Sequence, residues 1–323
     1  MKKVLKALRK IYSKIIPVPK LPELVYERDA EIVSQMIYNL LSSDAPCMIA
    51  RFGYTELSAM VNYMGVKQGK PHLLRYIKGE TLDWWWHPER INNMQMLSGF
   101  FPPTVHKLSE FCELMMKDTT YIDILGSWVN EEYYFRDYLS NAQKIQLGLL
   151  EPYFSANPWS RVLKGKNVLI VHPFAETIEK QYQKRQSLFE NKEILPEFKL
   201  YTIPAVQSLG GESNGFSDWF EALQWMKDEI DKVNYDICLI GCGAYGFPLA
   251  AHVKRQGKKA VHLGGALQIL FGIRGKRWED PNLGVNEGVP PNFYINLMNE
   301  SWVRPGDNLK PPGADQIEGG CYW

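Results

Sequence analysis

The sequence lacks any uninterrupted apolar run of the roughly 20 residues that a membrane-spanning helix needs. It also lacks an excess of charge, since 37 lysines and arginines oppose 36 aspartates and glutamates and leave a formal net charge of +1. A chain of this balance has no overall field to attract a nucleic-acid backbone. These absences argue against an integral membrane protein and against nucleic acid as a partner.

Cysteine is scarce, with five residues in a chain of 323. An odd number in a long chain without a recognisable secretory signal favours reduced thiols and a cytoplasmic protein over a disulfide framework. Only Cys238 and Cys242 lie close together, and their spacing is not the two-residue spacing that zinc sites favour. Without repeats or low-complexity segments, and with 45% hydrophobic residues, the chain is expected to form one or two domains with a sizeable core.

The N-terminal segment, residues 2 to 16, has the pattern of an amphipathic helix. Six basic residues surround an apolar stripe, and no acidic residue occurs before Glu23. Two interpretations stay open: an interfacial helix that contacts an anionic membrane, and a surface helix that packs its stripe on the domain. Three prolines between residues 17 and 22 predict a stiff linker, so residues 1–24 are expected to precede the folded domain.

Strand-like and helix-like segments alternate along the rest of the chain. Helices are predicted near residues 29–43 and 216–232. Apolar runs predict strands at residues 46–50, 121–126, 167–171, 198–204, 235–240 and 260–263. This order predicts an α/β fold with a doubly wound, mostly parallel, Rossmann-like sheet. The predicted domain covers residues 25–280, with a helical, aromatic-rich insertion at about 57–160, and residues 281–323 are expected to form an irregular tail anchored by aromatic side chains.

Three apolar strands are each followed by a segment that contains glycine, histidine or an acidic residue. These segments are residues 51–56, 172–177 and 241–246. Ligands bind at the carboxyl ends of parallel strands, so these segments predict a nucleotide site at one edge of the sheet. A tight turn without a ligand is the alternative for residues 241–246. The residues predicted to bind the nucleotide are Arg51, Gly53, Thr177, Gly241, Gly243, Tyr245, Gly246, His262, Gly264 and Gly265.

Two residues of this edge are predicted to be catalytic. Glu56 follows a glycine turn and is the acid best placed to act as a general base. His172 follows a buried strand, where an imidazole could donate to phosphate oxygens or stabilise a leaving diphosphate. The structural alternatives are an ion pair between Glu56 and Arg51 at a helix start, and a hydrogen-bonded core histidine.

The segment Arg51-Phe-Gly-Tyr-Thr-Glu56 resembles the Arg-Phe-Gly-Asp-x-Glu signature of the GT-D-fold glycosyltransferases. Residues 172–178, 241–249 and 262–273 are similar to chains of that kind from bacterial surface-polysaccharide loci, so the resemblance covers about residues 30 to 280. It implies transfer of a sugar from a nucleoside-diphosphate sugar, with UDP as the expected carrier. The implied acceptor is a glycan or a lipid-linked glycan made in polysaccharide biosynthesis, at the inner face of the plasma membrane.

Tyr54 stands where the family has a metal-ligating aspartate. The resemblance implies Mg²⁺ or Mn²⁺, and this departure leaves two alternatives open: Glu56 binds the metal together with donor phosphates, or amides, arginine and histidine meet the diphosphate charge without a metal. Two other classes also stay open. A Rossmann-type oxidoreductase would need an acid after strand 260–263, and an inactive nucleotide- or glycan-binding relative would explain Tyr54.

Overall fold

The structure of this chain is a computed structural model that describes residues 2–18, 20–306, 310 and 320–323. The strands are β1 Cys47–Arg51, β2 Ile124–Ser127, β3 Gln143–Gln146, β4 Asn167–His172, β5 Lys199–Pro204, β6 Ile237–Ile240 and β7 Lys259–His262. The α-helices are α1 Lys2–Ile15, α2 Ala30–Ser42, α3 Tyr54–Gln68, α4 Leu73–Ile77, α5 Pro88–Met96, α6 Val105–Thr119, α7 Ala175–Tyr182, α8 Arg185–Leu188, α9 Trp219–Asp231, α10 Gly246–Arg255, α11 Leu267–Leu270 and α12 Phe293–Leu297.

Within the described residues, the strands form one seven-stranded sheet in the order β3-β2-β1-β7-β6-β4-β5. Every neighbouring pair is parallel. The predicted α/β fold with a doubly wound, Rossmann-like sheet is therefore confirmed. Because the strands all run the same way, their carboxyl ends lie on one edge of the sheet.

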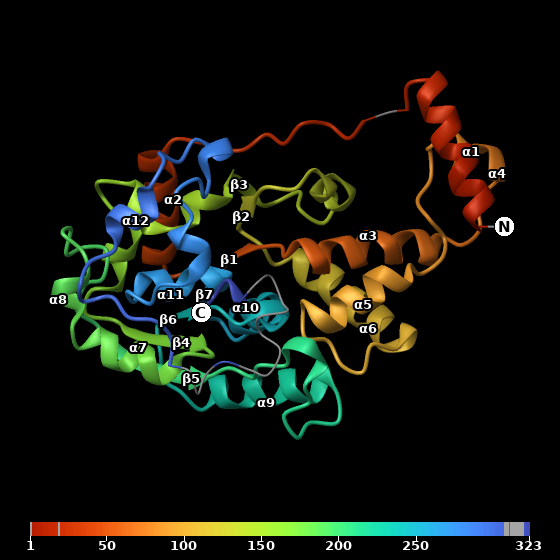
Figure 1. The fold of residues 1–323 in the computed structure, drawn as a ribbon. Helices are drawn as coiled ribbons and strands as arrows, with labels where there is room; N and C mark the ends of the chain where they lie inside the picture. The colour runs from red at the N-terminus through yellow and green to blue at the C-terminus, as the bar shows by residue number, and fades with distance from the viewer. Residues whose placement is uncertain (1, 19, 307–309, 311–319) are drawn as a thin grey trace.

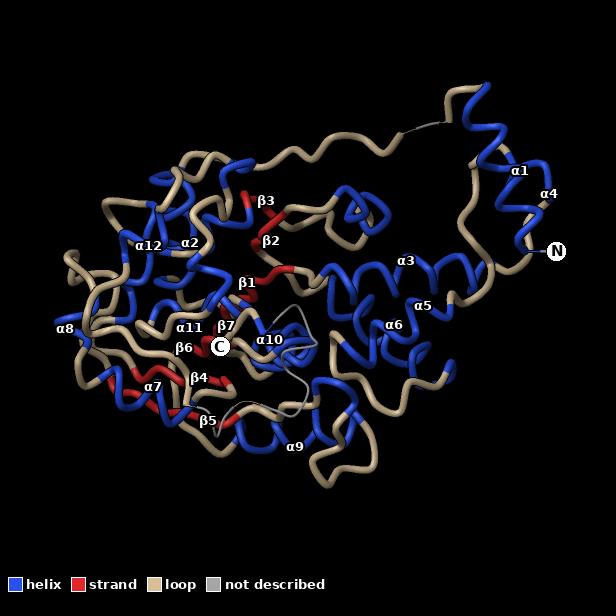
Figure 2. Tube along the Cα trace, viewed as in Figure 1, coloured by secondary structure: helices blue, strands red, loops and turns tan. Residues whose placement is uncertain are grey.

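Side chains of the central strands alternate between two hydrophobic cores, one on each face of the sheet. In β1, Met48 and Ala50 belong to one core, whereas Cys47 and Ile49 belong to the other. Helices α3, α6, α9 and α10 supply the first core, and α2, α7 and α11 supply the second (Figures 1 and 2). Strands covered on both faces must be apolar throughout, which explains the continuous apolar runs in the sequence.

The sequence prediction omitted β3 at the edge of the sheet. Its sequence is Gln-Lys-Ile-Gln, in which only Ile145 is buried. An edge strand exposes half of its backbone groups and most of its side chains, so it carries a weak apolar signal. Residues 57–160, predicted as an insertion, contribute β2 and β3 to the sheet as well as helices α3 to α6.

The N-terminal helix α1 lies away from the sheet, beside α4 (Figure 1). At the other terminus, Trp278, Tyr294 and Trp302 are buried in the second core and hold down the segment that contains α12. Residues 307–309 and 311–319 of the predicted tail lie outside the described residues. No helix in the described part of the chain combines the length and apolar character required to cross a bilayer.

Candidate functional site

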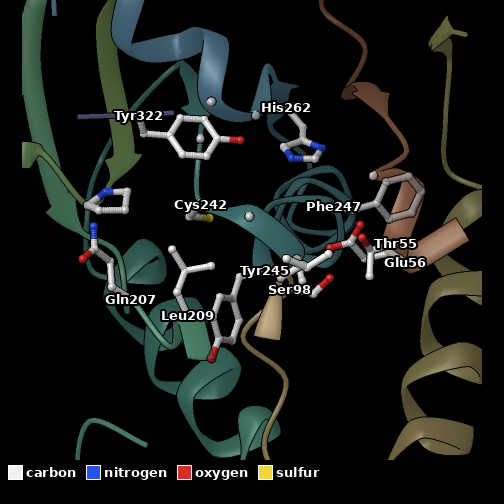
Figure 3. Close-up of a pocket in the computed structure, with 18 of the residues that line it drawn as sticks. Thr55, Glu56, Ser98, Gln207, Leu209, Cys242, Tyr245, Phe247, His262 and Tyr322 are labelled. Atoms are coloured by element: carbon white, nitrogen blue, oxygen red, sulfur yellow. The ribbon is translucent and has the colours of Figure 1, made fainter. Parts of the chain in front are cut away.

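A cavity of about 370 Å³ opens at the carboxyl edge of the sheet. It is lined by residues that follow β1, β4, β5, β6 and β7, and Figure 3 shows Glu56, Gln207, His262 and Tyr322 placed around it. This size suits a small-molecule site. The predicted site residues that line it are Arg51, Gly53, Glu56, His172, Gly241, Gly243, Tyr245, His262, Gly264 and Gly265.

Thr177 and Gly246 are the two predicted residues outside this lining. Thr177 is half-buried in α7, past the turn that carries His172. Gly246 begins α10, and a Cβ at this position would collide with the His262 ring. Gly246 therefore lets the helix approach His262 from behind the cavity, which is a packing role for a glycine in a strand-to-helix turn.

The turn between β1 and α3 places Glu56 in the cavity wall. Glu56 is only 9% exposed, and its carboxylate folds back over Gly53, where a Cβ would collide with Oε2. The φ of Gly53 is −76°, which any residue can adopt, so a side chain here would act by displacing the Glu56 carboxylate. No salt bridge joins Glu56 to Arg51 among the described residues. The carboxylate instead lies at the first turn of α3, where the helix dipole favours negative charge.

Arg51 is held against an aromatic face at the opposite side of the same turn. Its guanidinium carbon lies 5.2 Å from the centroid of the Trp128 ring, and Trp128 Nε1 donates to the carbonyl of Phe52 at 3.0 Å. A cation stacked on an aromatic ring is oriented without losing its charge. Arg51 therefore contributes a fixed positive charge to the cavity wall.

A second guanidinium lies across the cavity. The guanidinium carbon of Arg277 is 5.0 Å from the Tyr322 ring centroid, and that ring packs so closely on Gly265 that a Cβ there would collide with it. Among the described lining residues, Arg51 and Arg277 are opposed by one carboxylate, that of Glu56.

His172 is a neutral hydrogen-bonding group in this site. Its Nδ1 accepts from the Phe174 N–H at 3.0 Å. Burial lowers the pKa of His172 to about 3, because the charged ring would lose its hydration. A neutral ring that accepts through Nδ1 carries its proton on Nε2, so the donor that His172 offers is Nε2–H.

His262 is also neutral. Burial lowers its pKa to about 3, the positive charge of Arg51 adds to this effect, and a hydrogen bond to the Arg51 backbone opposes it. The ring atom Nδ1 has no hydrogen-bond partner among the described residues. Both predicted histidines can therefore serve as neutral polar groups toward a ligand, but not as cations near neutral pH.

The loop at residues 241–246 is closely packed at Gly241 and has free space beside Gly243. A Cβ at Gly241 would lie 2.6 Å from the Gly264 carbonyl oxygen and 2.8 Å from His172 Cδ2, so glycine is required by close packing. Gly243 has a φ of +55°, and a Cβ there would meet no atom within 4 Å. Gly243 thus combines a left-handed backbone with free space beside it.

Tyr245 anchors this loop through its ring and its hydroxyl. Its ring stacks on Trp219 with centroids 4.8 Å apart and an interplanar angle of 7°, and its hydroxyl shares a 2.8 Å hydrogen bond with Ser208. Burial raises the pKa of Tyr245 well above its usual value, so the hydroxyl stays protonated. The hydrogen bond between Tyr245 and Ser208 also joins the loop after β5 to the loop at residues 241–246.

The sequence analysis missed several lining residues, among them Ser98, Gln268 and Arg277. Ser98 Oγ and Gln268 Oε1 are buried without a hydrogen-bond partner among the described residues, as is His262 Nδ1. Unpartnered buried polar atoms cost free energy, and their gathering at one cavity is typical of a site that receives a polar ligand or water. Gln268 had a usable signal, since it is the one polar residue of the apolar helix α11.

The donor set does not fit a Mg²⁺ or Mn²⁺ centre, for which the implied ligands were carboxylates. Glu56 is the one carboxylate among the described lining residues, and no group of three His, Cys, Asp or Glu residues in the described chain could hold a metal. Tyr54, at the position of the family's aspartate, is 56% exposed at the cavity mouth. Among the described lining residues, Glu56 therefore has no second carboxylate with which to bind a metal.

Comparisons with protein-family models, with curated proteins and with solved structures found no match to this chain.

Proposed function

We propose that this protein is a glycosyltransferase that moves a sugar from a nucleoside-diphosphate sugar, with UDP as the expected carrier, to a glycan or lipid-linked acceptor. The observation that carries the proposal is the meeting of Arg51, Glu56, His172, His262 and the loop at residues 241–246 at one cavity. From Arg51 to His262, these residues span about two thirds of the chain. The resemblance of residues 51–56 to the GT-D-fold signature gives the reaction class.

The diphosphate of the donor is assigned to the wall formed by Arg51 and the glycine loop. Gly243 leaves room for close approach to the backbone, and the loop runs into the N-terminus of α10, whose dipole favours anions. Arg51 supplies a positive charge, and His172 supplies the Nε2–H as a hydrogen-bond donor. Neutral histidines suit this role because a hydrogen bond to phosphate needs only an N–H group.

The acceptor is assigned to the side of the cavity that Tyr54 and Trp128 border. Both rings are exposed, by 56% and 37%, and their centroids lie 6.4 Å apart. Flat apolar faces with polar edges are suited to stacking against sugar rings. This position would bring an acceptor hydroxyl toward Glu56, which follows Tyr54 by two residues.

The proposed reaction is direct transfer of the sugar. Glu56 accepts the proton of the acceptor hydroxyl, and the oxygen forms a bond to the anomeric carbon. The bond between that carbon and the diphosphate oxygen breaks, and its electron pair leaves with the diphosphate. Arg51, the loop amides and His172 stabilise the charge that develops on the leaving group. No step is assigned to a metal.

Ligand binding and turnover together test this proposal. Calorimetry with UDP, GDP, CMP and NAD measures which nucleotide the cavity binds, and release of UDP from UDP-sugars measures transfer or donor hydrolysis. Binding of UDP with turnover supports the proposal. Binding of NAD alone would identify an oxidoreductase instead, and tight UDP binding without turnover on any donor would identify an inactive relative.

A further inference from the structure

Helix α1 is attached to the protein through its basic side. The ammonium groups of Lys2 and Lys6 lie 5.6 and 5.8 Å from the centroid of the Trp85 ring, and the guanidinium of Arg9 lies 5.0 Å from that of Tyr76. Arg9 also donates to the carbonyl of Thr81 at 3.0 Å. These contacts hold the helix by cation–π and hydrogen-bond interactions, together with the burial of Leu5 against Tyr76 and Trp85.

The apolar stripe of α1 faces away from the protein. Leu5 is the buried residue of the helix. Val4, Leu8, Ile11 and Ile15 are between 42% and 75% exposed. Their spacing of three and four residues places them within an arc of about 60° on the helix. We call these four residues the exposed stripe. The exposed stripe therefore does not pack on the domain, whereas Leu5, which belongs to the apolar side predicted from the sequence, is buried with Tyr76 and Trp85.

A row of lysines borders the exposed stripe. Lys3, Lys10 and Lys14 are exposed and lie about 100° around the helix from the stripe, between the stripe and the face that contacts Trp85 and Tyr76. The neighbouring helix α4 adds a further apolar side chain, Leu74, which is 60% exposed. The combination of apolar stripe and flanking lysines is that of a helix lying in the interface of an anionic bilayer.

We propose that the exposed stripe of α1 binds the surface of an anionic lipid bilayer and holds the whole protein there. Burial of the stripe among acyl chains supplies apolar stabilisation, and the three lysines of the row interact with lipid phosphates. A second copy of the chain is the less favourable occupant. An antiparallel copy would bring the lysine row of one chain against that of the other and add like-charge repulsion. This inference is independent of the proposed function, because it rests on none of the cavity residues.

The test is sedimentation of the full chain with vesicles, at low and at high salt. Vesicles of equimolar phosphatidylcholine and phosphatidylglycerol should carry the protein into the pellet at low salt, and high salt should release much of it because screening weakens the lysine contribution. Vesicles of phosphatidylcholine alone should bind at least about tenfold more weakly. Equal binding to both kinds of vesicle would overturn the assignment to anionic lipid.

Variants locate the binding face. Leu8→Ser with Ile11→Ser should lower the partition coefficient for anionic vesicles by about tenfold or more without lowering the melting temperature, because both side chains are exposed. Val25→Ser with Val105→Ser is the matched control, since these side chains are exposed elsewhere in the protein and should leave binding unchanged. Equal sedimentation of the Leu8 and Ile11 variant and the wild type would overturn the proposal.

Two further results would also overturn it. The first is wild-type protein that stays in the supernatant with anionic vesicles at low salt. The second is a concentration-dependent dimer in sedimentation velocity that the Leu8→Ser and Ile11→Ser changes convert to monomer, which would assign the exposed stripe to a second copy of the chain.

Discussion

The carboxylate of Glu56 occupies the space beside Gly53 that a side chain would fill. One residue thus stands at the start of α3 and in the wall of the cavity at once. In the helix, the negative charge of this carboxylate interacts with the helix dipole. In the proposed reaction, the carboxylate acts as a base. The two roles can be separated by substitution.

Glu56→Gln should reduce turnover by about 10² or more while leaving nucleotide binding nearly unchanged, since the amide cannot accept the acceptor proton. Loss of the charge at the first turn of α3 should cost only about 0.3–1 kcal/mol of folding stability. Steady-state kinetics and thermal melting measure the two effects. Glu176→Gln is the control, because Glu176 is an exposed first-turn acid of α7 outside the cavity lining. Unchanged turnover in Glu56→Gln would assign Glu56 a structural role.

Gly53→Ala should disturb the same carboxylate without removing it. The new methyl group would collide with Glu56 Oε2, so the side chain must move or the turn must shift, at a cost of about 1–3 kcal/mol. We expect turnover to fall toward that of Glu56→Gln. Gly148→Ala is the comparison, since a Cβ at Gly148 would meet nothing within 4 Å. Full activity in Gly53→Ala would show that the position of the Glu56 carboxylate does not matter.

Gly243→Val tests the nucleotide site directly. The left-handed backbone of Gly243 should make any side chain cost about 1–2 kcal/mol, and the valine side chain would extend into the free space beside the loop. Calorimetry should show nucleotide binding weakened at least tenfold. Gly165→Val has the same left-handed conformation and free space, but lies outside the cavity lining, so it should share the loss of stability and keep binding. Equal nucleotide binding by the two variants would show that the nucleotide does not bind beside Gly243.

The buried histidines should make the protein less stable in mild acid. An unfolded histidine with a pKa of 6.5 takes up a proton below that pH, whereas folded His172 does so only near pH 3, so its stabilising contribution is present above pH 6.5 and is lost as the pH falls from 6.5 toward 3. Between pH 7.5 and 5 the expected loss is about 2 kcal/mol for each histidine that behaves in this way.

His172→Asn tests this titration, because the asparagine oxygen can replace Nδ1 as acceptor for the Phe174 N–H but does not titrate. Urea unfolding at pH 7.5 and pH 5 should show a smaller difference in unfolding free energy than in the wild type, by about 2 kcal/mol. His106→Asn changes an exposed histidine and should leave the difference unaltered. If His172→Asn and the wild type lose the same unfolding free energy between pH 7.5 and pH 5, His172 does not cause the loss of stability in acid.

The sequence predicted those parts of the fold that burial on both faces makes apolar. Strands β4, β6 and β7 read as continuous apolar runs, and their order with the helices predicted the parallel sheet. The edge strand β3 was missed, because a strand with one buried side chain resembles a polar loop. Boundaries moved by a few residues, as in α9, which begins at Trp219 after its N-cap Asp218 rather than at residue 216.

The candidate site was predicted where local chemistry and topology act together. Residues 51–56, His172 and the loop at residues 241–246 end apolar strands, and parallel strands bring such ends to one edge. Ser98 and Arg277 reach the same cavity from segments with no motif, through long-range packing that a local pattern does not encode. Thr177 stands near the motif in sequence but lies past the turn on α7, outside the described cavity lining.

The wall made by Tyr322 has a consequence for biosynthesis. The sheet has all its strands once β7 has been made, yet the cavity at its edge still lacks the ring that packs on Gly265 and the partner of the Arg277 guanidinium. Domains fold largely as they emerge from the ribosome, from the N-terminus onward. A nascent chain that ends between β7 and residue 320 therefore has every strand of the sheet, while this part of the cavity wall is still missing.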